Sequence, residues 1–230
     1  MSTEAVLIAA AAVLYLADCL VLLERGQALW ARGTLAFGSL HYQFRGKTVA
    51  VLNPLAPFVP VSRTLPLFAT GFGMDPAAVV RVLSPVGVLA ALQFMLLFVA
   101  LPWSLVRAPG LPFLAGLLLA YLNAVLMLGL IAQRFGRAGI ARRPLLALGF
   151  GWLACLPLSV NCARKAGLTF EIAMDAREAL RDLPAPARER AAAALAAQAT
   201  EAAQELDEGD ARHGDLMALK RQLEAGDGRA

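Results

Sequence analysis

The chain has 230 residues, of which 59% are hydrophobic, and its mean hydropathy is +0.62. A soluble domain is usually about 45–50% apolar, so this composition argues against an ordinary soluble protein, and long apolar runs indicate a membrane protein. Residues 1–163 hold 11 Lys and Arg against 4 Asp and Glu, whereas residues 164–230 hold 10 against 13. Basic residues in loops beside apolar runs report membrane topology and anionic lipid, so we expect no nucleic-acid partner.

Four apolar runs are each long enough to cross about 30 Å of hydrocarbon, which takes about 20 helical residues. They are residues 5–23, 82–106, 111–133 and 144–162. Proline stands near the start of the last three runs, where it suits a first helical turn. We therefore predict an all-α polytopic membrane protein, with a four-helix transmembrane domain at residues 1–163 and a soluble charged helical tail at residues 164–230.

The first run contains one carboxylate, Asp18, five residues before the end of the run. An ionisable group inside a membrane is by default a functional hypothesis, so Asp18 could bind an ion, a proton or a substrate. The alternative is a structural carboxylate that pairs with Arg25 or hydrogen-bonds to another helix. We favour the structural role, because a charge in this position costs only about 3 kcal/mol on insertion scales.

The first loop, residues 24–81, is interrupted by four prolines between positions 54 and 66 and is not predicted to span the membrane. Within it, residues 40–52 (LHYQFRGKTVAVL) alternate apolar and polar side chains around Arg45-Gly46, a pattern that predicts a β-hairpin. An isolated hairpin is only marginally stable in water. We expect this hairpin to pack against the membrane, the helix bundle or a partner.

Aromatic and basic side chains are interleaved in the same loop, in a pattern typical of a surface that contacts lipid headgroups. The candidates for such contacts are Trp30, Arg32, Arg45 and Lys47. The alternative is that these are ordinary topology-setting cations together with the hairpin's own packing residues.

Two amides lie near the middle of the second and third runs, Gln93 and Asn123, and Asn123 borders a ridge of small residues. Small residues let transmembrane helices approach each other, and amides then bridge them, so helix packing is the simpler interpretation. The stronger hypothesis is one intramembrane polar cluster that contains Asp18, Gln93 and Asn123. Pro102 and Pro157 lie inside runs and are expected to kink their helices.

The tail shows an apolar stripe at helical spacing between Leu168 and Leu183, which Pro184 and Pro186 interrupt. Residues 187–208 predict an alanine-rich second helix and residues 214–225 a third. The alanine-rich face is too weakly apolar to predict a coiled coil, so we interpret these helices as solvated or loosely docked.

Lys and Arg counts beside the runs predict the orientation. The loops at 24–81 and 134–143 carry ten of them, and the other side carries three, namely Arg107, Arg164 and Lys165. Four spans would then place both loops in the cytoplasm and both termini outside. Abundant Ala and Arg, together with the absence of an Asn-x-Ser/Thr sequon, suit a bacterial inner membrane.

Catalytic motifs are missing from the sequence: there is no Gly-x-Ser-x-Gly, no phosphate-binding glycine loop and no metal-ligand spacing around His41 or His213. We therefore expect no enzyme activity and no cofactor. The leading hypothesis is a non-enzymatic interaction or assembly protein that binds the lipid bilayer and a protein partner through the first-loop hairpin or the tail. The alternative is a small transporter or a membrane-embedded lipid-modifying enzyme that uses Asp18.

Overall fold

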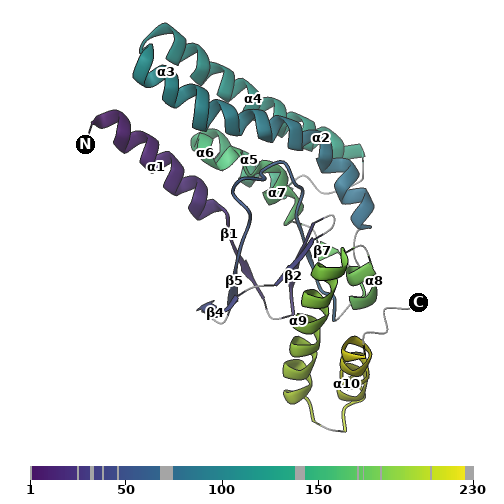
Figure 1. Cartoon of the computed structure of the whole chain (residues 1–230). Coiled ribbons are helices and arrows are strands. Elements are labelled where there is room, and N and C mark those ends of the chain that lie inside the picture. Colours follow the sequence, from purple (N-terminus) through teal and green to yellow (C-terminus); the bar gives the residue numbers. More distant parts are fainter. Residues whose placement is uncertain are drawn as a thin grey trace. The chain divides into compact units, whose positions relative to one another are not determined.

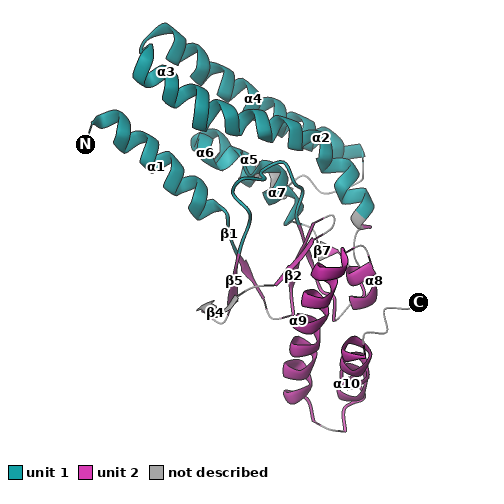
Figure 2. Ribbon diagram, viewed as in Figure 1, with its two compact units in different colours: residues 1–21, 51–61, 76–169 teal, residues 22–50, 62–75, 170–230 magenta. Residues whose placement is uncertain are grey.

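The computed structural model describes residues 2–24, 26–31, 34–37, 39–45, 47–67, 75–137, 143–169, 171–172, 174–181, 183–207 and 209–225. The fold is mostly helical, with small sheets near the N-terminus (Figure 1). The chain forms two compact units (Figure 2). Unit 1 comprises Met1–Val21, Val51–Val61 and Pro76–Thr169, and unit 2 comprises Leu22–Ala50, Ser62–Asp75 and Phe170–Ala230.

Unit 1 is a helix bundle. Its helices are α1 (Thr3–Asp18), α2 (Pro76–Met95), the π-helical η1 (Leu96–Ala100), α3 (Leu101–Arg107), α4 (Leu111–Arg137), α5 (Arg143–Ala154), α6 (Leu156–Ser159) and α7 (Cys162–Gly167). Two described helices, Ala77–Arg107 and Leu111–Arg137, are long and apolar enough to cross a membrane. They correspond to the second and third predicted runs. Tyr15 of α1 packs against the rings of Phe94 and Phe98, which joins α1 to the long helix.

The first predicted run is helical only as far as Asp18. The next residues form strand β1 (Leu20–Leu23), in which Val21 and Leu23 are buried while Leu20 and Leu22 are exposed. This alternation has the period of two of a half-buried strand. A short run of leucine and valine is equally apolar in either conformation, so hydropathy alone did not separate the two.

The kink expected at Pro102 takes the form of a π-helical turn. The N–H of Leu101 donates to the carbonyl of Leu96, five residues earlier. Proline has no N–H to donate, and its ring clashes with the carbonyl four residues earlier in an α-helix. Widening the preceding turn moves that carbonyl away, so the long helix continues without a break.

The fourth predicted run does not form one continuous helix, so this part of the prediction is wrong. Helix α5 ends at Ala154, and Cys155 is extended (φ −137°, ψ 91°) before the short helix α6, whose second residue is Pro157. Proline cannot donate the hydrogen bond that would continue α5 through this point.

The chain also reverses its direction along α4 at this break. Gly149 lies against Leu128 of α4, whereas Leu156 packs near Ala120 and Ala124, closer to the start of α4. Cys162 is then back beside Met127, with 3.2 Å between the two sulfur atoms. Residues 143–167 therefore form a helical hairpin that enters the bundle and returns toward the end from which it came (Figure 1).

Unit 2 is built around a four-stranded sheet with the order β3-β2-β6-β7. Strand β2 (Ala28–Ala31) pairs antiparallel with β3 (Thr34–Phe37) and with β6 (Ser62–Thr64). Strand β6 pairs in parallel with β7 (Glu171–Ile172), in the register Arg63 to Glu171 and Thr64 to Ile172. The sheet therefore joins the first loop to the segment that follows the helix bundle.

A second sheet has the order β1-β5-β4 and contains the predicted hairpin. Strands β4 (Ser39–Phe44) and β5 (Lys47–Val51) pair antiparallel, with Phe44 opposite Lys47. This confirms the hairpin predicted at residues 40–52. Arg45 in its turn has a φ of +51°, the left-handed conformation that tight hairpin turns require.

The tail helices of unit 2 are α8 (Ala176–Arg181), α9 (Ala185–Gln204) and α10 (Ala211–Glu224). Ala199 and Ala203 of α9 are buried against Leu216 of α10, because alanine lets the two helices approach closely. A second cluster places Leu180 and Leu195 in the core with Leu35, Phe37 and Leu67 packed against it. The alanine-rich face is thus packed within unit 2, more closely than the loose docking that we expected, while other residues of the tail helices, such as Arg190, are exposed.

Candidate functional site

Gln93 of α2 and Asn123 of α4 meet in the interior of unit 1. The amide nitrogen of Asn123 donates to Oε1 of Gln93 (2.8 Å) and to the carbonyl of Leu89 (3.0 Å). The amide nitrogen of Gln93 donates to Oγ of Ser159 (2.9 Å), which itself donates to the carbonyl of Leu156 (2.6 Å). Gln93, Asn123 and Ser159 are all buried. We call these three side chains the amide layer; they link α2, α4 and α6.

Asp18 belongs to a different group of side chains, at the C-terminal end of α1. Its Oδ1 lies 3.1 Å from Nζ of Lys165, and its Oδ2 accepts a hydrogen bond of 3.1 Å from Asn161. Within the part of the chain that the structure describes, no hydrogen bond joins Asp18 to Gln93 or Asn123. The earlier alternative of a pair with Arg25 concerns a residue outside the described ranges.

Arg164 is the largest fully buried side chain of the described residues, with only 1% of its surface exposed. One guanidinium nitrogen donates to Oδ1 of Asn161 (3.1 Å), and the other donates to the carbonyls of Asn53 and Ala56. The arginine therefore satisfies backbone carbonyls of a proline-rich segment that has no regular secondary structure. We call residues 53–61 the proline segment.

Two glycines allow the proline segment to lie directly against the helices. A Cβ atom at Gly87 of α2 would lie closer than 3.0 Å to the carbonyl oxygen of Phe58, and one at Gly167 of α7 would meet the carbonyl of Val61 in the same way. The hydroxyl of Tyr15 also donates to the carbonyl of Pro54 (2.5 Å). Main-chain contacts of this kind fix the segment on the bundle.

The sequence did not indicate the roles of Asn161, Arg164 and Lys165. The pair Arg164-Lys165 directly after an apolar run was counted only as topology-setting charge. Its burial depends on the chain reversal at Cys155, which carries residues 161–165 back beside α1. The charges of this group are Asp18, Arg164 and Lys165, and their hydrogen bonds run to each other, to Asn161 and to backbone carbonyls. This arrangement holds helices and a loop in place.

The thiols and possible metal ligands of unit 1 form no cluster in the part of the chain that the structure describes. Cys19 and Cys162 are buried free thiols, and Cys155 is half-buried. No group of three or more His, Cys, Asp or Glu residues that could hold a metal ion occurs among the residues described.

The four candidates for headgroup contact are placed differently from one another. Trp30 is 5% exposed in the central strand β2, so its ring is not available to a lipid headgroup. Lys47 forms an ion pair with Glu24 (2.8 Å) and thereby holds the pKa of that carboxyl below its usual value. The guanidinium of Arg45 lies 5.4 Å from the centre of the Phe44 ring. Arg32 lies outside the described residues.

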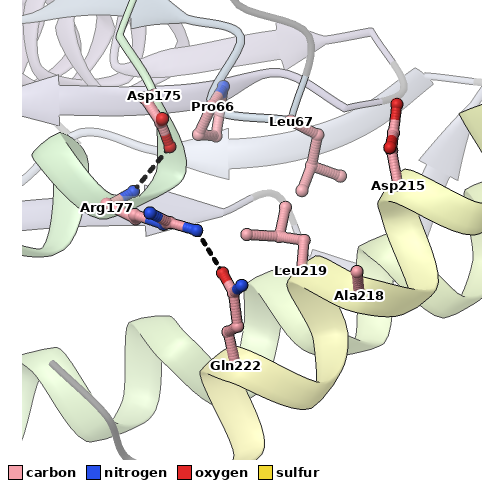
Figure 3. Close-up of a pocket in the computed structure, with 8 residues that line it drawn as sticks. All are labelled: Pro66, Leu67, Asp175, Arg177, Asp215, Ala218, Leu219 and Gln222. Atoms are coloured by element: carbon pink, nitrogen blue, oxygen red, sulfur yellow. Dashed lines mark hydrogen bonds between the residues drawn. The ribbon is translucent and has the colours of Figure 1, made fainter.

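Unit 2 contains an open pocket of about 410 Å³ (Figure 3). Apolar side chains, among them Leu67 and Leu219, point into its centre, and the carboxylates of Asp175 and Asp215 lie on opposite sides. Arg177 donates to Oε1 of Gln222 across one edge, which ties the start of α8 to α10. The complete lining is Pro66, Leu67, Asp175, Arg177, Asp215, Ala218, Leu219 and Gln222.

Comparison of the chain with models of protein families, with curated proteins and with solved structures found no match.

Proposed function

We propose that this chain is an integral protein of a bacterial inner membrane that acts by binding other proteins and catalyses no reaction. In this proposal unit 1 is inserted in the bilayer, and unit 2 is displayed on its cytoplasmic face as the binding module. The pairing of β6 with β7 supports the topology of this proposal, because it unites chain segments from before and after the bundle in one folded unit, and the pocket of unit 2 supports its binding role.

That pairing supports a topology with three crossings. Strands β6 and β7 are neighbours in one sheet, so the first loop and the tail must lie on the same side of the membrane. An odd number of crossings between them would forbid this. The crossings between them are α2–α3 and α4, while the hairpin of residues 143–167 enters and leaves on one side. Helix α1 provides the third crossing, and the C-terminus lies inside, unlike in the four-span expectation.

The distribution of basic residues supports the same topology. Arg164 and Lys165 follow the reversed hairpin, so they join the ten cations of the two loops on the cytoplasmic side. Only Arg107, of the Lys and Arg residues up to position 165, then remains on the opposite side. The bias expected for cytoplasmic loops thus becomes stronger with three crossings than with four.

The exposed surface of unit 1 supports its insertion in a bilayer. Leu111, Leu114, Leu118, Leu122 and Val125 are large apolar side chains along α4, and each is more than half exposed. A continuous apolar surface of this kind is rare on soluble proteins and is the normal outer surface of a membrane helix. Helix α1, with 16 residues, is about 24 Å long and requires local thinning of the bilayer to cross it.

Unit 2 has the chemical character of a binding module for a basic partner. Its C-terminal part, residues 170–230, is acidic, with 8 Lys and Arg against 13 Asp and Glu, while the whole unit holds 13 against 15. The pocket combines an apolar centre with two carboxylates, Asp175 and Asp215. An apolar side chain flanked by lysine or arginine on a partner would match both features, since the charge favours encounter and the buried apolar contact contributes affinity.

The transporter or lipid-enzyme hypothesis has less support. It needs Asp18, Gln93 and Asn123 to converge on one site. The two amides are hydrogen-bonded to each other, whereas Asp18 is engaged by Asn161 and Lys165. Polar groups that already satisfy one another leave little capacity for a substrate.

Site-specific photocrosslinking in intact cells tests the proposed function. A photoreactive residue replaces the exposed Ala218 at the pocket; matched positions are Arg190, exposed on α9, and the lipid-facing Leu118. We expect Ala218 to give a discrete protein adduct that is lost in Asp175→Asn/Asp215→Asn, while the control positions give none. Equal adducts at all three positions, or an adduct that is indifferent to the two carboxylates, would overturn the proposal.

A further inference from the structure

Three arginines lie at the same end of the two long helices of unit 1, and we call them the arginine rim: Arg81 of α2 and Arg134 and Arg137 of α4. The helices run antiparallel, since Gly116 of α4 lies against Leu101, whereas Asn123, further along α4, hydrogen-bonds to the earlier residues Gln93 and Leu89. Arg81 is twelve residues from Gln93, which is about 18 Å along the helix. Arg134 and Arg137 are about 16 Å and 21 Å from Asn123 on the same scale.

These distances correspond to the level of lipid phosphates. The amide layer lies near the middle of both apolar helices, and the hydrocarbon core extends about 15 Å to each side of the midplane. A typical tilt of about 20° shortens the axial distances by only about a twentieth. The guanidinium groups of the arginine rim are therefore at, or just beyond, the edge of the hydrocarbon on the proposed cytoplasmic side.

The arginine rim has no carboxylate partner among the residues that the structure describes. None of its three members forms an ion pair with another residue in the described ranges, in contrast to Lys47, Lys165 and Lys220. Arg81 and Arg137 are exposed, and Arg134 is half-buried with a buried Nε that has no hydrogen-bond partner. The exposed guanidinium groups of Arg81 and Arg137 can therefore donate hydrogen bonds to an acceptor from outside the chain.

We infer that the arginine rim is a binding site for the phosphate group of an anionic phospholipid of the cytoplasmic leaflet. One guanidinium group can bind a phosphate through two parallel N–H···O hydrogen bonds. Three guanidinium groups at one level of the membrane can therefore contact one lipid headgroup or two neighbouring ones. This inference rests on the proposed insertion of unit 1 in a bilayer. It assigns headgroup binding to the ends of α2 and α4, a place different from the first-loop residues Trp30, Arg32, Arg45 and Lys47.

The test uses the full chain purified in a mild non-ionic detergent and titrated with short-chain phosphatidylglycerol or phosphatidylcholine, with bound lipid counted by native mass spectrometry. Inorganic phosphate and glycerol phosphate are tested as competitors. The variants are Arg134→Gln/Arg137→Gln and Arg81→Gln. The matched control is Arg107→Gln, at the opposite end of the long helix. Each variant's unfolding midpoint without lipid shows whether it is folded.

A basic residue near an anionic lipid surface contributes about fivefold to affinity. We therefore expect phosphatidylglycerol to bind more tightly than phosphatidylcholine, and Arg134→Gln/Arg137→Gln to weaken it about 25-fold. Arg107→Gln should leave the affinity within about twofold of the native value. Binding without preference for the anionic lipid, or equal losses in Arg107→Gln, would overturn the inference. Effective competition by millimolar inorganic phosphate would also overturn it, because the site would then bind a free anion.

The two proposals fail separately. If unit 2 binds no partner but the lipid preference is lost with the arginine rim, only the proposed function is refuted. If photocrosslinking at Ala218 persists in Arg134→Gln/Arg137→Gln and no anionic lipid is bound, only the lipid site is refuted.

Discussion

Replacement of Gly87 by alanine tests whether the proline segment is packed directly against α2. The new Cβ would approach the carbonyl oxygen of Phe58 closer than 3.0 Å and its carbonyl carbon to 3.2 Å. Carbon atoms in favourable contact are about 3.5–4.0 Å apart, so the segment would have to withdraw by about 1 Å. The neighbour is main chain, which cannot rotate away as a side chain can.

The expected magnitude follows from three contributions. Overpacking of this kind costs about 1–3 kcal/mol. Withdrawal of the segment weakens the hydrogen bonds from Arg164 to the carbonyls of Asn53 and Ala56, which costs about 1 kcal/mol more. Alanine in place of glycine within a helix returns about 1 kcal/mol. We therefore expect Gly87→Ala to lower the free energy of unfolding by about 2 kcal/mol.

Gly129→Ala is the matched control. Gly129 is also helical, on α4, but nothing lies within 4 Å of a Cβ placed there. The same substitution should then be neutral or stabilise the protein by up to about 1 kcal/mol. The assay is equilibrium unfolding in mixed micelles of a mild detergent and dodecyl sulfate. Equal stabilities for Gly87→Ala and Gly129→Ala would refute the packing of the proline segment on α2.

Other substitutions test the two polar groups of unit 1 in the same unfolding assay. Asn123→Ala should lower the free energy of unfolding by about 1–2 kcal/mol. A double-mutant cycle with Gln93→Ala should give a coupling energy of about 0.6 kcal/mol and no more than about 1.7 kcal/mol. A coupling energy of zero would contradict the hydrogen bond between the two amides. Asp18→Asn keeps an acceptor for the amide of Asn161 and should cost about 1 kcal/mol or less. Asp18→Leu leaves the amide of Asn161 and the ammonium of Lys165 without this partner and should cost about 1–3 kcal/mol. Loss of a cellular phenotype in Asp18→Asn at native stability would instead favour the transporter or enzyme hypothesis. Arg164→Met should be the most damaging change, at about 3–5 kcal/mol, because it leaves three buried neutral acceptors without a donor, at about 1–3 kcal/mol each. Lysine should not rescue it, since its ammonium lacks the planar fork that joins three acceptors. A loss below about 1 kcal/mol would show that the buried guanidinium does not hold the proline segment.

The sequence was sufficient to predict a contact where the residues involved have only one low-energy arrangement. Gln93 and Asn123 lie mid-run on neighbouring apolar helices, and buried amides in that position find each other because no water is present to satisfy them. The alternation around Arg45-Gly46 was likewise sufficient for the hairpin, because a tight turn between alternating segments fixes the pairing.

Prediction failed where the outcome depended on contacts distant in sequence. Residues 20–23 and 144–162 are as apolar as the long helices, and their departure from a continuous helix depends on partners such as β5 and α4. The chain reversal at Cys155 has a local signal in Pro157, which was interpreted as a kink. The role of Arg164 follows from that reversal and has no local signal, since a cation after an apolar run is ordinary at a membrane surface.

Measurement of the membrane topology tests most directly whether the first loop and the tail lie on the same side of the bilayer. After replacement of the three native cysteines, single cysteines at Arg45, Ala108 and Arg221 are exposed to a membrane-impermeant maleimide in intact cells and in permeabilised cells. Three crossings predict that Ala108→Cys reacts in intact cells, and that Arg45→Cys and Arg221→Cys react only after permeabilisation. If Arg45→Cys and Arg221→Cys react from opposite sides of the membrane, the first loop and the tail cannot share a sheet, and the account is contradicted.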